Sequence, residues 1–116
     1  MNGMPPISAD EWKGIYNMWK MNRFKMLADS VNAVKPIFIE SEGGARAIDF
    51  RITLQNDETT MLLSLEAVEN TEDVSLLRAC IKEDRKDAVR FKGDEAEKLA
   101  GLFGIEKAVI DWIAFR

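Results

Sequence analysis

Histidine is absent from this chain of 116 residues, and cysteine occurs once. Without histidine, the chain lacks the commonest general base near neutral pH and the commonest zinc ligand. A single cysteine can form neither an intrachain disulfide nor a Cys-x-x-Cys site. We therefore expect a protein that is not an enzyme and that holds no metal and no cofactor, although carboxylate- or lysine-based chemistry stays open.

Long apolar runs are also missing, and none approaches the roughly 20 residues that a membrane-spanning helix needs. Residues 1–6 lack the basic region and apolar core of a secretory signal. We expect a cytoplasmic protein that does not contact a membrane. Hydrophobic residues make up 47% of the chain and charged residues 31%, which is ordinary for a globular protein. The length predicts a single domain over residues 1–116, with residues 1–7 as an irregular tail.

The centre of the chain predicts a three-stranded antiparallel meander, with strands Ile37–Ser41, Arg46–Gln55 and Thr60–Val68. Apolar and polar residues alternate along the second and third strands, as in strands with one buried face. Gly43-Gly44 suits a tight hairpin turn. The inward residues then form opposing pairs: Ile39 with Ile48, Ile37 with Phe50, Leu54 with Met61, Ile52 with Leu63, Phe50 with Leu65, and Ile48 with Ala67.

One pair in this register is unfavourable, because Asp49 faces Glu66 and like charges that face each other destabilise a sheet. A shift of two residues that pairs Arg51 with Glu66 is therefore the alternative. We expect the whole fold to be α+β, with a long N-terminal helix packed on the meander, followed by two helices and one or two further short strands.

The N-terminal helix is predicted to begin at a capping box, Ser8 to Glu11, and to end between Asp29 and Val34. A stripe at helical spacing is expected to cover the inner face of the meander: Trp12, Ile15, Tyr16, Trp19, Met26 and Leu27. Three further apolar residues project away from that stripe and indicate either core packing or self-association as a homodimer: Met18, Met21 and Phe24.

After the meander, Asn70 or Thr71 is predicted to cap a helix whose apolar face includes Leu77 and Ile81, with Cys80 as a buried thiol. Ala88–Phe91 is a candidate short strand. Another helix is expected over Glu95–Phe103 and ends at Gly104.

The tail has two interpretations. We favour a closing strand over Ala108–Phe115, because the segment is rich in Val, Ile, Trp and Phe. The alternative is a second helix, because Ala96–Phe115 resembles the spacing of a bacterial helix-turn-helix, with Ala100 and Gly104 at its small-residue positions. The resemblance implies DNA binding. The residues that it would expose are a poor set for reading bases, without net positive charge: Glu106, Lys107, Ala108, Asp111 and Trp112.

Acidic residues are concentrated in the centre of the chain, where residues 40–73 carry nine acidic side chains against Arg46 and Arg51. An acidic block repels nucleic acid and favours a basic partner. We therefore predict a small acidic inhibitor, of the toxin-immunity or mobile-element and phage anti-defence type, that binds a larger basic protein, which could itself handle nucleic acid. A DNA-binding domain over residues 96–115, and a small ligand-binding module or carboxylate enzyme, are the alternatives. The residues expected to contact the partner lie on the outer sheet face and its loops: Phe38, Glu40, Asp49, Asp57, Glu58, Leu62, Glu66 and Glu69.

Overall fold

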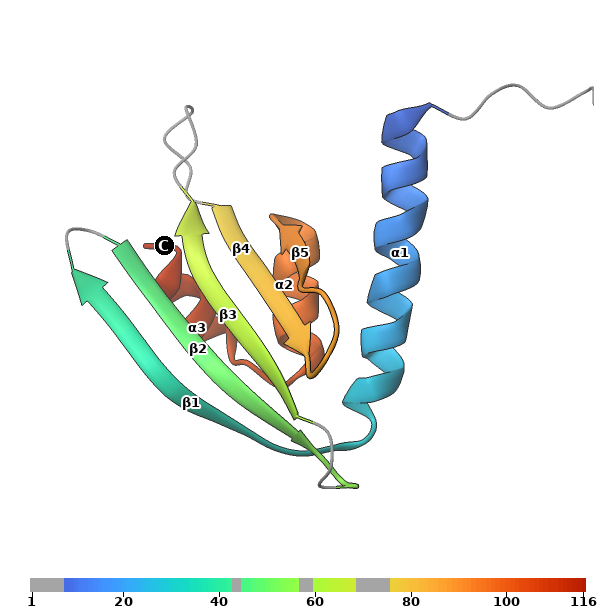
Figure 1. Cartoon of the computed structure of the whole chain (residues 1–116). Coiled ribbons are helices and arrows are strands. Elements are labelled where there is room, and N and C mark those ends of the chain that lie inside the picture. Colours follow the sequence, from blue (N-terminus) through green and yellow to red (C-terminus); the bar gives the residue numbers. More distant parts are fainter. Residues whose placement is uncertain (1–7, 43–44, 57–59, 69–75) are drawn as a thin grey trace, which may run out of the picture.

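The computed structural model describes residues 8–42, 45–56, 60–68 and 76–116. They form an α+β fold with one five-stranded antiparallel sheet and, in the described ranges, three helices (Figure 1). The elements in chain order are α1 (Ala9–Ala28), β1 (Val31–Glu42), β2 (Ala45–Leu54), β3 (Thr60–Val68), β4 (Leu76–Glu83), β5 (Val89–Lys92), α2 (Asp94–Leu102) and α3 (Lys107–Ile113).

The sheet is a simple meander with the strand order β1-β2-β3-β4-β5. The predicted three-stranded meander is confirmed as its first part, and β3 has the predicted bounds. β1 is longer than expected, because it begins at Val31 and not at Ile37. It is an edge strand, and Pro36 sits at a bulge, where the register shifts between Pro36 and Phe38. Proline is tolerated at such a place because its missing N–H breaks no central ladder.

The bulge affects the register between β1 and β2. Ile39 opposes Ile48 as predicted, but the predicted pair of Ile37 with Phe50 is wrong. Pro36 takes the position opposite Phe50 instead. The extra residue in the bulge is the physical reason, since alternation alone carries no sign of an inserted residue.

The predicted register between β2 and β3 is wrong by two residues. Met61 opposes Ile52, and Leu63 opposes Phe50. The shift is opposite in direction to the one that pairs Arg51 with Glu66, so that alternative is wrong as well. A shift of two keeps every inward residue paired with an inward residue, and alternation cannot detect it. It also places Ser64 opposite Asp49, which removes the like-charge pair with Glu66.

The helix predicted around Leu77 and Ile81 is a strand, β4, which pairs with β3. A spacing of four residues fits one face of a helix and also one face of a strand, so these two residues do not distinguish the two structures. Leu77, Ala79 and Ile81 are fully buried on one face of the sheet. The predicted buried thiol of Cys80 is therefore half-buried on the opposite face. The proposed caps at Asn70 and Thr71 lie outside the described residues.

The later short elements agree better with the expectation. β5 and α2 are confirmed within about one residue, since element ends vary by that much. The favoured strand over Ala108–Phe115 is wrong, and the alternative of a second helix is right, as α3. Ile110 and Ile113, three residues apart, are buried on one face of α3. Burial beneath the sheet explains the apolar composition that suggested a strand.

α2 and α3 lie on the same face of the sheet, behind the strands in Figure 1, and we call this side the inner face. The core lies between these two helices and the inward side chains of the strands. It includes the following fully buried residues: Ile52, Leu63, Leu65, Leu77, Ile81, Leu99 and Ile113.

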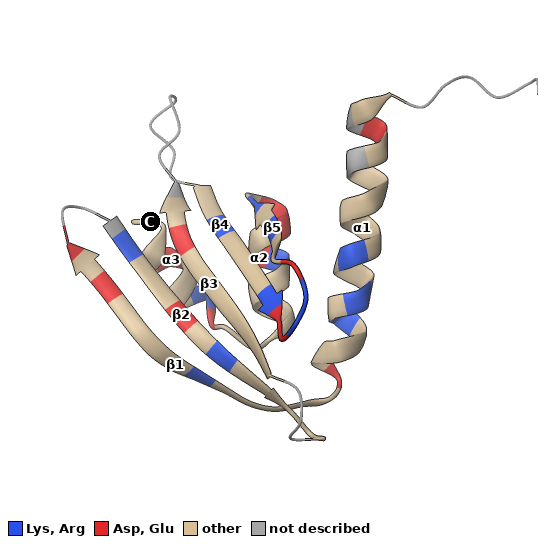
Figure 2. Cartoon of the chain, viewed as in Figure 1, with Lys and Arg blue, Asp and Glu red and all other residues tan. Residues whose placement is uncertain are grey.

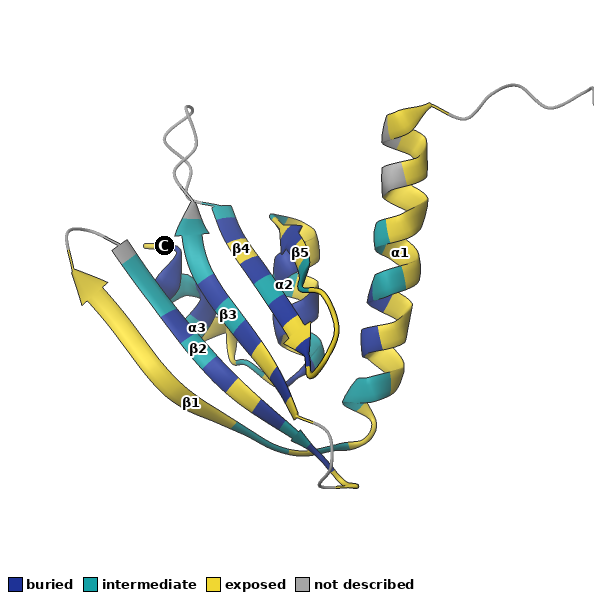
Figure 3. Cartoon of the chain, in the orientation of Figure 1, coloured by how far each residue is buried: buried dark blue, intermediate teal, exposed yellow. Residues whose placement is uncertain are grey.

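α1 stands beside the β5 edge and α2 (Figure 1), so the prediction that it covers the inner face is wrong. α2 and α3 already occupy that face. The described side chains of α1 that are buried are Met21 and Phe24, and the predicted stripe faces solvent except for the half-buried Leu27 (Figure 3). The Phe24 ring meets the Phe91 ring edge-on, with centroids 6.3 Å apart. The radius of gyration, 15.9 Å, exceeds the roughly 13 Å of a compact domain of this length.

Candidate functional site

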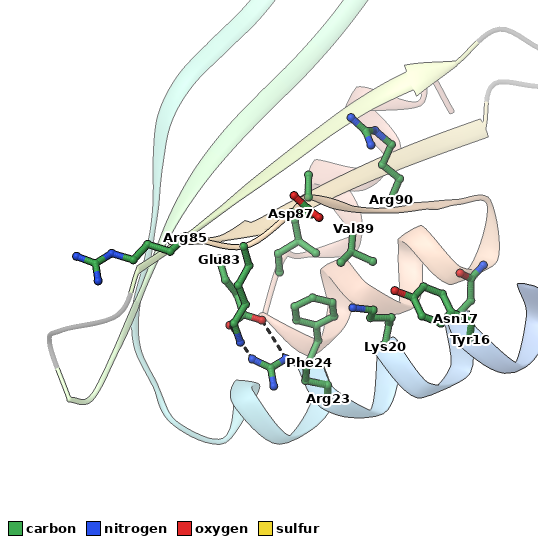
Figure 4. Close-up of a pocket in the computed structure, with 13 residues that line it drawn as sticks. Tyr16, Asn17, Lys20, Arg23, Phe24, Glu83, Arg85, Asp87, Val89 and Arg90 are labelled. Carbon is green, nitrogen blue, oxygen red and sulfur yellow. Dashed lines mark hydrogen bonds and ion pairs between the residues drawn. The ribbon is translucent and has the colours of Figure 1, made fainter.

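A groove with a volume of about 730 Å³ lies between α1 and the turn that joins β4 to β5 (Figure 4). The Glu83 carboxylate is the buried charge in it. Arg23 donates to this carboxylate from Nε, at 3.0 Å, and from Nη2, at 2.8 Å. The Lys86 ammonium lies 3.2 Å from the same carboxylate. Two of the basic side chains that line the groove are therefore already engaged with Glu83.

The protonation of these groups follows from their contacts. Burial by itself raises the pKa of the Glu83 carboxyl, but the hydrogen bonds from Arg23 and Lys86 outweigh burial and hold this pKa below its ordinary value. The hydrogen bond to Glu83 also raises the pKa of Arg23. The pair stays charged near neutral pH, and it joins α1 to the end of β4.

The groove offers few free groups for chemistry. Lys20 lies over the Tyr16 ring, with its Nζ 5.1 Å from the ring centroid. The Arg85 side chain points away from Glu83 and α1 (Figure 4). Among the described residues, no group of three or more acidic, histidine or cysteine side chains could hold a metal ion. We interpret the groove as the joint that fixes α1 to the body of the protein.

The second surface is the outer face of the sheet, the side turned away from α2 and α3. Among the residues that the structure describes, no helix covers it (Figure 1). Strand pairing places five of the eight predicted partner-binding residues on this face, on β1, β2 and β3: Phe38, Glu40, Asp49, Leu62 and Glu66. The other three, Asp57, Glu58 and Glu69, lie outside the described residues.

These five residues lie close together across the strands. Phe38 opposes Asp49, and Ala47 stands between Glu40 and Glu66 in one cross-strand row. Glu66 forms an ion pair with Arg78 of β4. In the described part of the chain, Glu40 and Asp49 form no ion pair. Their charges are therefore available to a partner.

The other half of the outer face is basic, which corrects the expectation that the sheet forms an acidic block. β4 contributes Arg78 and Lys82, and β5 contributes Arg90 and Lys92, all exposed (Figure 2). The linear count of acidic residues missed this half because a helix was expected in place of β4. Cys80 lies in the middle of the face, between Ser64 of β3 and Arg90 of β5.

The third surface is the solvent-facing side of α1. Trp12 is 57% exposed, Trp19 76% and Met26 74%, and Ile15 and Tyr16 are exposed beside them. The structure separates the three residues that were predicted for self-association. Met18 is exposed, whereas Met21 and Phe24 belong to the core.

The helix-turn-helix alternative does not fit the position of α3. α2 and α3 are joined at Gly104, but α3 packs against the inner face of the sheet through Ile110 and Ile113. Lys107 is the basic residue of α3, all of which is described, and it pairs with Asp111 at 3.2 Å. Nothing on α3 favours binding to the DNA backbone, which depends on unpaired cations.

Sequence reasoning missed the role of Arg46, which holds α3 against β2. Its Nη1 donates to the Trp112 carbonyl oxygen at 2.9 Å. Its guanidinium also lies over two rings, 4.9 Å from the centroid of Trp112 and 4.0 Å from that of Phe115. The alternation along β2 could have predicted this position. Arg46 lies two residues before the inward residue Ile48, so its side chain is on the same face of the strand.

Comparisons of the chain with protein-family models, with curated proteins and with solved structures found no match. None of the helices in the described ranges has the length and apolar character needed to cross a membrane.

Proposed function

We propose that this protein is a non-enzymatic binding protein whose outer sheet face docks on a larger protein. The observation that carries the proposal is that no helix among the described residues covers this face, which still presents Phe38 and Leu62, 55% and 39% exposed. Beside them lie Glu40 and Asp49, which form no ion pair with any described residue. Apolar side chains ringed by charged ones are typical of interfaces between proteins.

The charge pattern of the face indicates the chemistry of the partner. Glu40 and Asp49 lie at one side, and Arg90 and Lys92 lie at the other (Figure 2). A complementary partner presents basic groups opposite the first pair and acidic groups opposite the second. Such complementarity speeds encounter and rejects wrong partners. This build suits an inhibitor of the immunity or anti-defence type that occupies a surface of mixed charge on a larger protein.

A capture experiment with matched baits tests the proposal. The tagged wild type, Glu40→Lys/Asp49→Lys and a control, Glu95→Lys/Glu106→Lys, are incubated with an extract of the native host. The control makes the same change of net charge at exposed positions away from the sheet. We expect the wild type and the control to retain one larger protein that a salt step releases, and the outer-face variant to retain at least about tenfold less.

Other results of this experiment would overturn the proposal. Equal retention by the outer-face variant would remove the outer face from the interface. Retention of nucleic acid in place of a protein, lost with Arg90→Glu/Lys92→Glu, would assign the basic half to phosphate contacts.

Cys80 offers a second readout because it is the one cysteine of the chain and lies half-buried in the middle of the outer face. A bound partner should slow alkylation of this thiol by a bulky maleimide. An alkylation rate unchanged at saturating partner would contradict docking on this face.

A further inference from the structure

α1 carries an apolar stripe on the side opposite its buried residues, defined as Trp12, Ile15, Tyr16, Trp19 and Met26. At 100° per residue, this stripe lies across the helix from Met21 and Phe24. Trp, Tyr and Met are enriched in protein interfaces, and large exposed apolar groups mark them. The stripe is independent of the outer sheet face, because it lies on a different element.

Four residues of the stripe, together with Asn22, have the spacing of the seam of a two-stranded coiled coil. Trp12, Ile15, Trp19, Asn22 and Met26 follow one another at intervals of three, four, three and four residues. This is the spacing at which two helices pack along a shared seam. We propose that α1 forms an antiparallel homodimer, in which this stripe packs against the same stripe of a second copy.

The area of the stripe agrees with what a dimer needs. With the exposed fractions of its five side chains, roughly 600 Å² of each copy is available for burial. Two copies then bury about 1,200 Å², which reaches the lower limit of specific protein interfaces. The edge of the sheet is a poorer route to a dimer, because β1 carries Pro36, a bulge and the charges of Glu40 and Glu42.

Charge complementarity selects the antiparallel direction. Glu11 and Lys25 flank the seam on the same side, near its two ends, and in the described part of the chain neither forms an ion pair. When Trp12 lies level with Asn22 of the second copy, Glu11 lies next to Lys25 of that copy, and symmetry makes the contact twice. A parallel pair would place Glu11 next to Tyr16 instead.

The position of the body agrees with this direction. The core contacts of α1 come from its C-terminal half, at Met21 and Phe24, and nearly all described side chains of its first half are exposed (Figure 3). An antiparallel pair lays the free first half of one helix along the second half of the other. The two bodies then lie at opposite ends of the helix pair, without overlap.

Sedimentation equilibrium of the purified full chain tests the proposal through a charge-swap cycle. We expect the wild type to dimerise and Glu11→Lys or Lys25→Glu to weaken the dimer about tenfold each. The double variant Glu11→Lys/Lys25→Glu should restore affinity to within about threefold of the wild type. Glu95→Lys and Lys98→Glu, at exposed positions of α2, are the matched controls. A wild type that stays monomeric up to about 100 µM, or a double variant as weak as the singles, would overturn the proposal.

Cross-linking tests the direction of the pair. In a Cys80→Ser background, Met18→Cys lies near the two-fold axis and should give an intermolecular disulfide on oxidation. Glu11→Cys in the same background should not, because the two positions lie at opposite ends of an antiparallel pair. A disulfide at position 11 alone would indicate a parallel pair and overturn the proposal.

The dimer can be distinguished by experiment from another role of α1 and from the proposed function. A monomeric wild type that binds phosphatidylserine-containing vesicles would assign the stripe to a lipid surface and overturn the dimer. Dimerisation is measured without any partner, and its variants leave the outer face intact. Failure of the capture experiment therefore leaves the dimer unaffected, and the reverse also holds.

Discussion

Arg23 of α1 donates two hydrogen bonds to the carboxylate of Glu83 at the end of β4, at 3.0 Å from Nε and 2.8 Å from Nη2. The two residues are 60 positions apart in the sequence. Parallel N–H···O bonds from one guanidinium to one carboxylate fix direction as well as distance. With the Phe24–Phe91 ring contact beside it, this pair sets the position of α1, and with it the direction in which the exposed stripe of α1 faces.

We expect Glu83→Gln to lower the free energy of unfolding by about 1–2 kcal/mol, because the neutral amide weakens charged hydrogen bonds to Arg23 and Lys86. Arg23 is half-exposed, so the cost stays below the roughly 3–5 kcal/mol of a fully buried broken pair. Urea unfolding measures the difference. Glu95→Gln, at an exposed position, is the control and should change stability by less than about 0.5 kcal/mol. Equal stability of Glu83→Gln and wild type would contradict the role of the pair.

The lowered pKa of the Glu83 carboxyl predicts that the free energy of unfolding depends on pH. Burial raises the pKa of Glu83, hydrogen bonds from Arg23 and Lys86 lower it more, and the folded pKa lies below the ordinary 4.5. A depressed folded pKa means that the contribution to stability is fully present above pH 4.5 and is lost as the pH falls through the folded pKa.

The free energies of unfolding of wild type and Glu83→Gln should therefore differ by a constant amount from neutral pH to about pH 5, and should converge below it. Urea titrations at several pH values check this expectation. A difference that grows on acidification would show that the carboxylate is not stabilised in the folded protein.

The contacts of the Arg46 guanidinium predict that lysine cannot replace arginine at this position without a loss of stability. It donates to the Trp112 carbonyl oxygen and lies over the Trp112 and Phe115 rings. Lysine keeps the charge but lacks the planar group that stacks on rings. We expect Arg46→Lys and Arg46→Ala both to destabilise the protein, by about 1 and 2 kcal/mol respectively.

Urea unfolding followed by far-ultraviolet circular dichroism measures both Arg46 variants. Arg51→Ala, at an exposed position of the same strand, is the control and should stay within about 0.5 kcal/mol of wild type. Full stability of Arg46→Lys would show that charge alone accounts for the contact.

Local patterns predicted the faces of the first three strands and the pairing of Ile39 with Ile48, but neither the bulge in β1 nor the register between β2 and β3. Period-two alternation indicates which side of β2 is buried. Registers that differ by two residues all bury that same side, so alternation cannot distinguish them. The observed alignment includes a bulge at Pro36 and places Ser64, not Glu66, opposite Asp49, and neither feature can be read from one strand alone. A similar ambiguity explains why a helix was predicted in place of β4. The spacing of Leu77 and Ile81 fits one face of a helix and one face of a strand.

The candidate surfaces were harder to predict because they depend on what the other elements cover. α1 has apolar residues on two sides, and the sequence indicates both. Which side is buried depends on α2 and α3, which occupy the inner face of the sheet and leave α1 at the β5 edge. The basic half of the outer face likewise exists because β4 joins the sheet, and counting charges along the chain cannot show that.

The turn after α2 was predictable from the sequence, and its geometry predicts the effect of a substitution at Gly104. Gly104 has a φ of +78°, and its N–H bonds to the Gly101 carbonyl oxygen at 3.1 Å. The Ile105 N–H bonds to the Ala100 carbonyl oxygen at 3.0 Å, which completes a Schellman motif. A side chain at position 104 is strained in this conformation, so we expect Gly104→Ala to destabilise the protein by about 1 kcal/mol.

Gly101→Ala, three residues earlier, is the matched control with the opposite sign. Gly101 lies within α2, is exposed, and has no atom within 4 Å of an added Cβ. Alanine there should stabilise the protein by about 0.5–1 kcal/mol, because it is the better helix former. Thermal unfolding of both variants checks the pair. Destabilisation by both would indicate that the turn tolerates no added side chain for reasons other than φ, and stabilisation by both would contradict the left-handed conformation of Gly104.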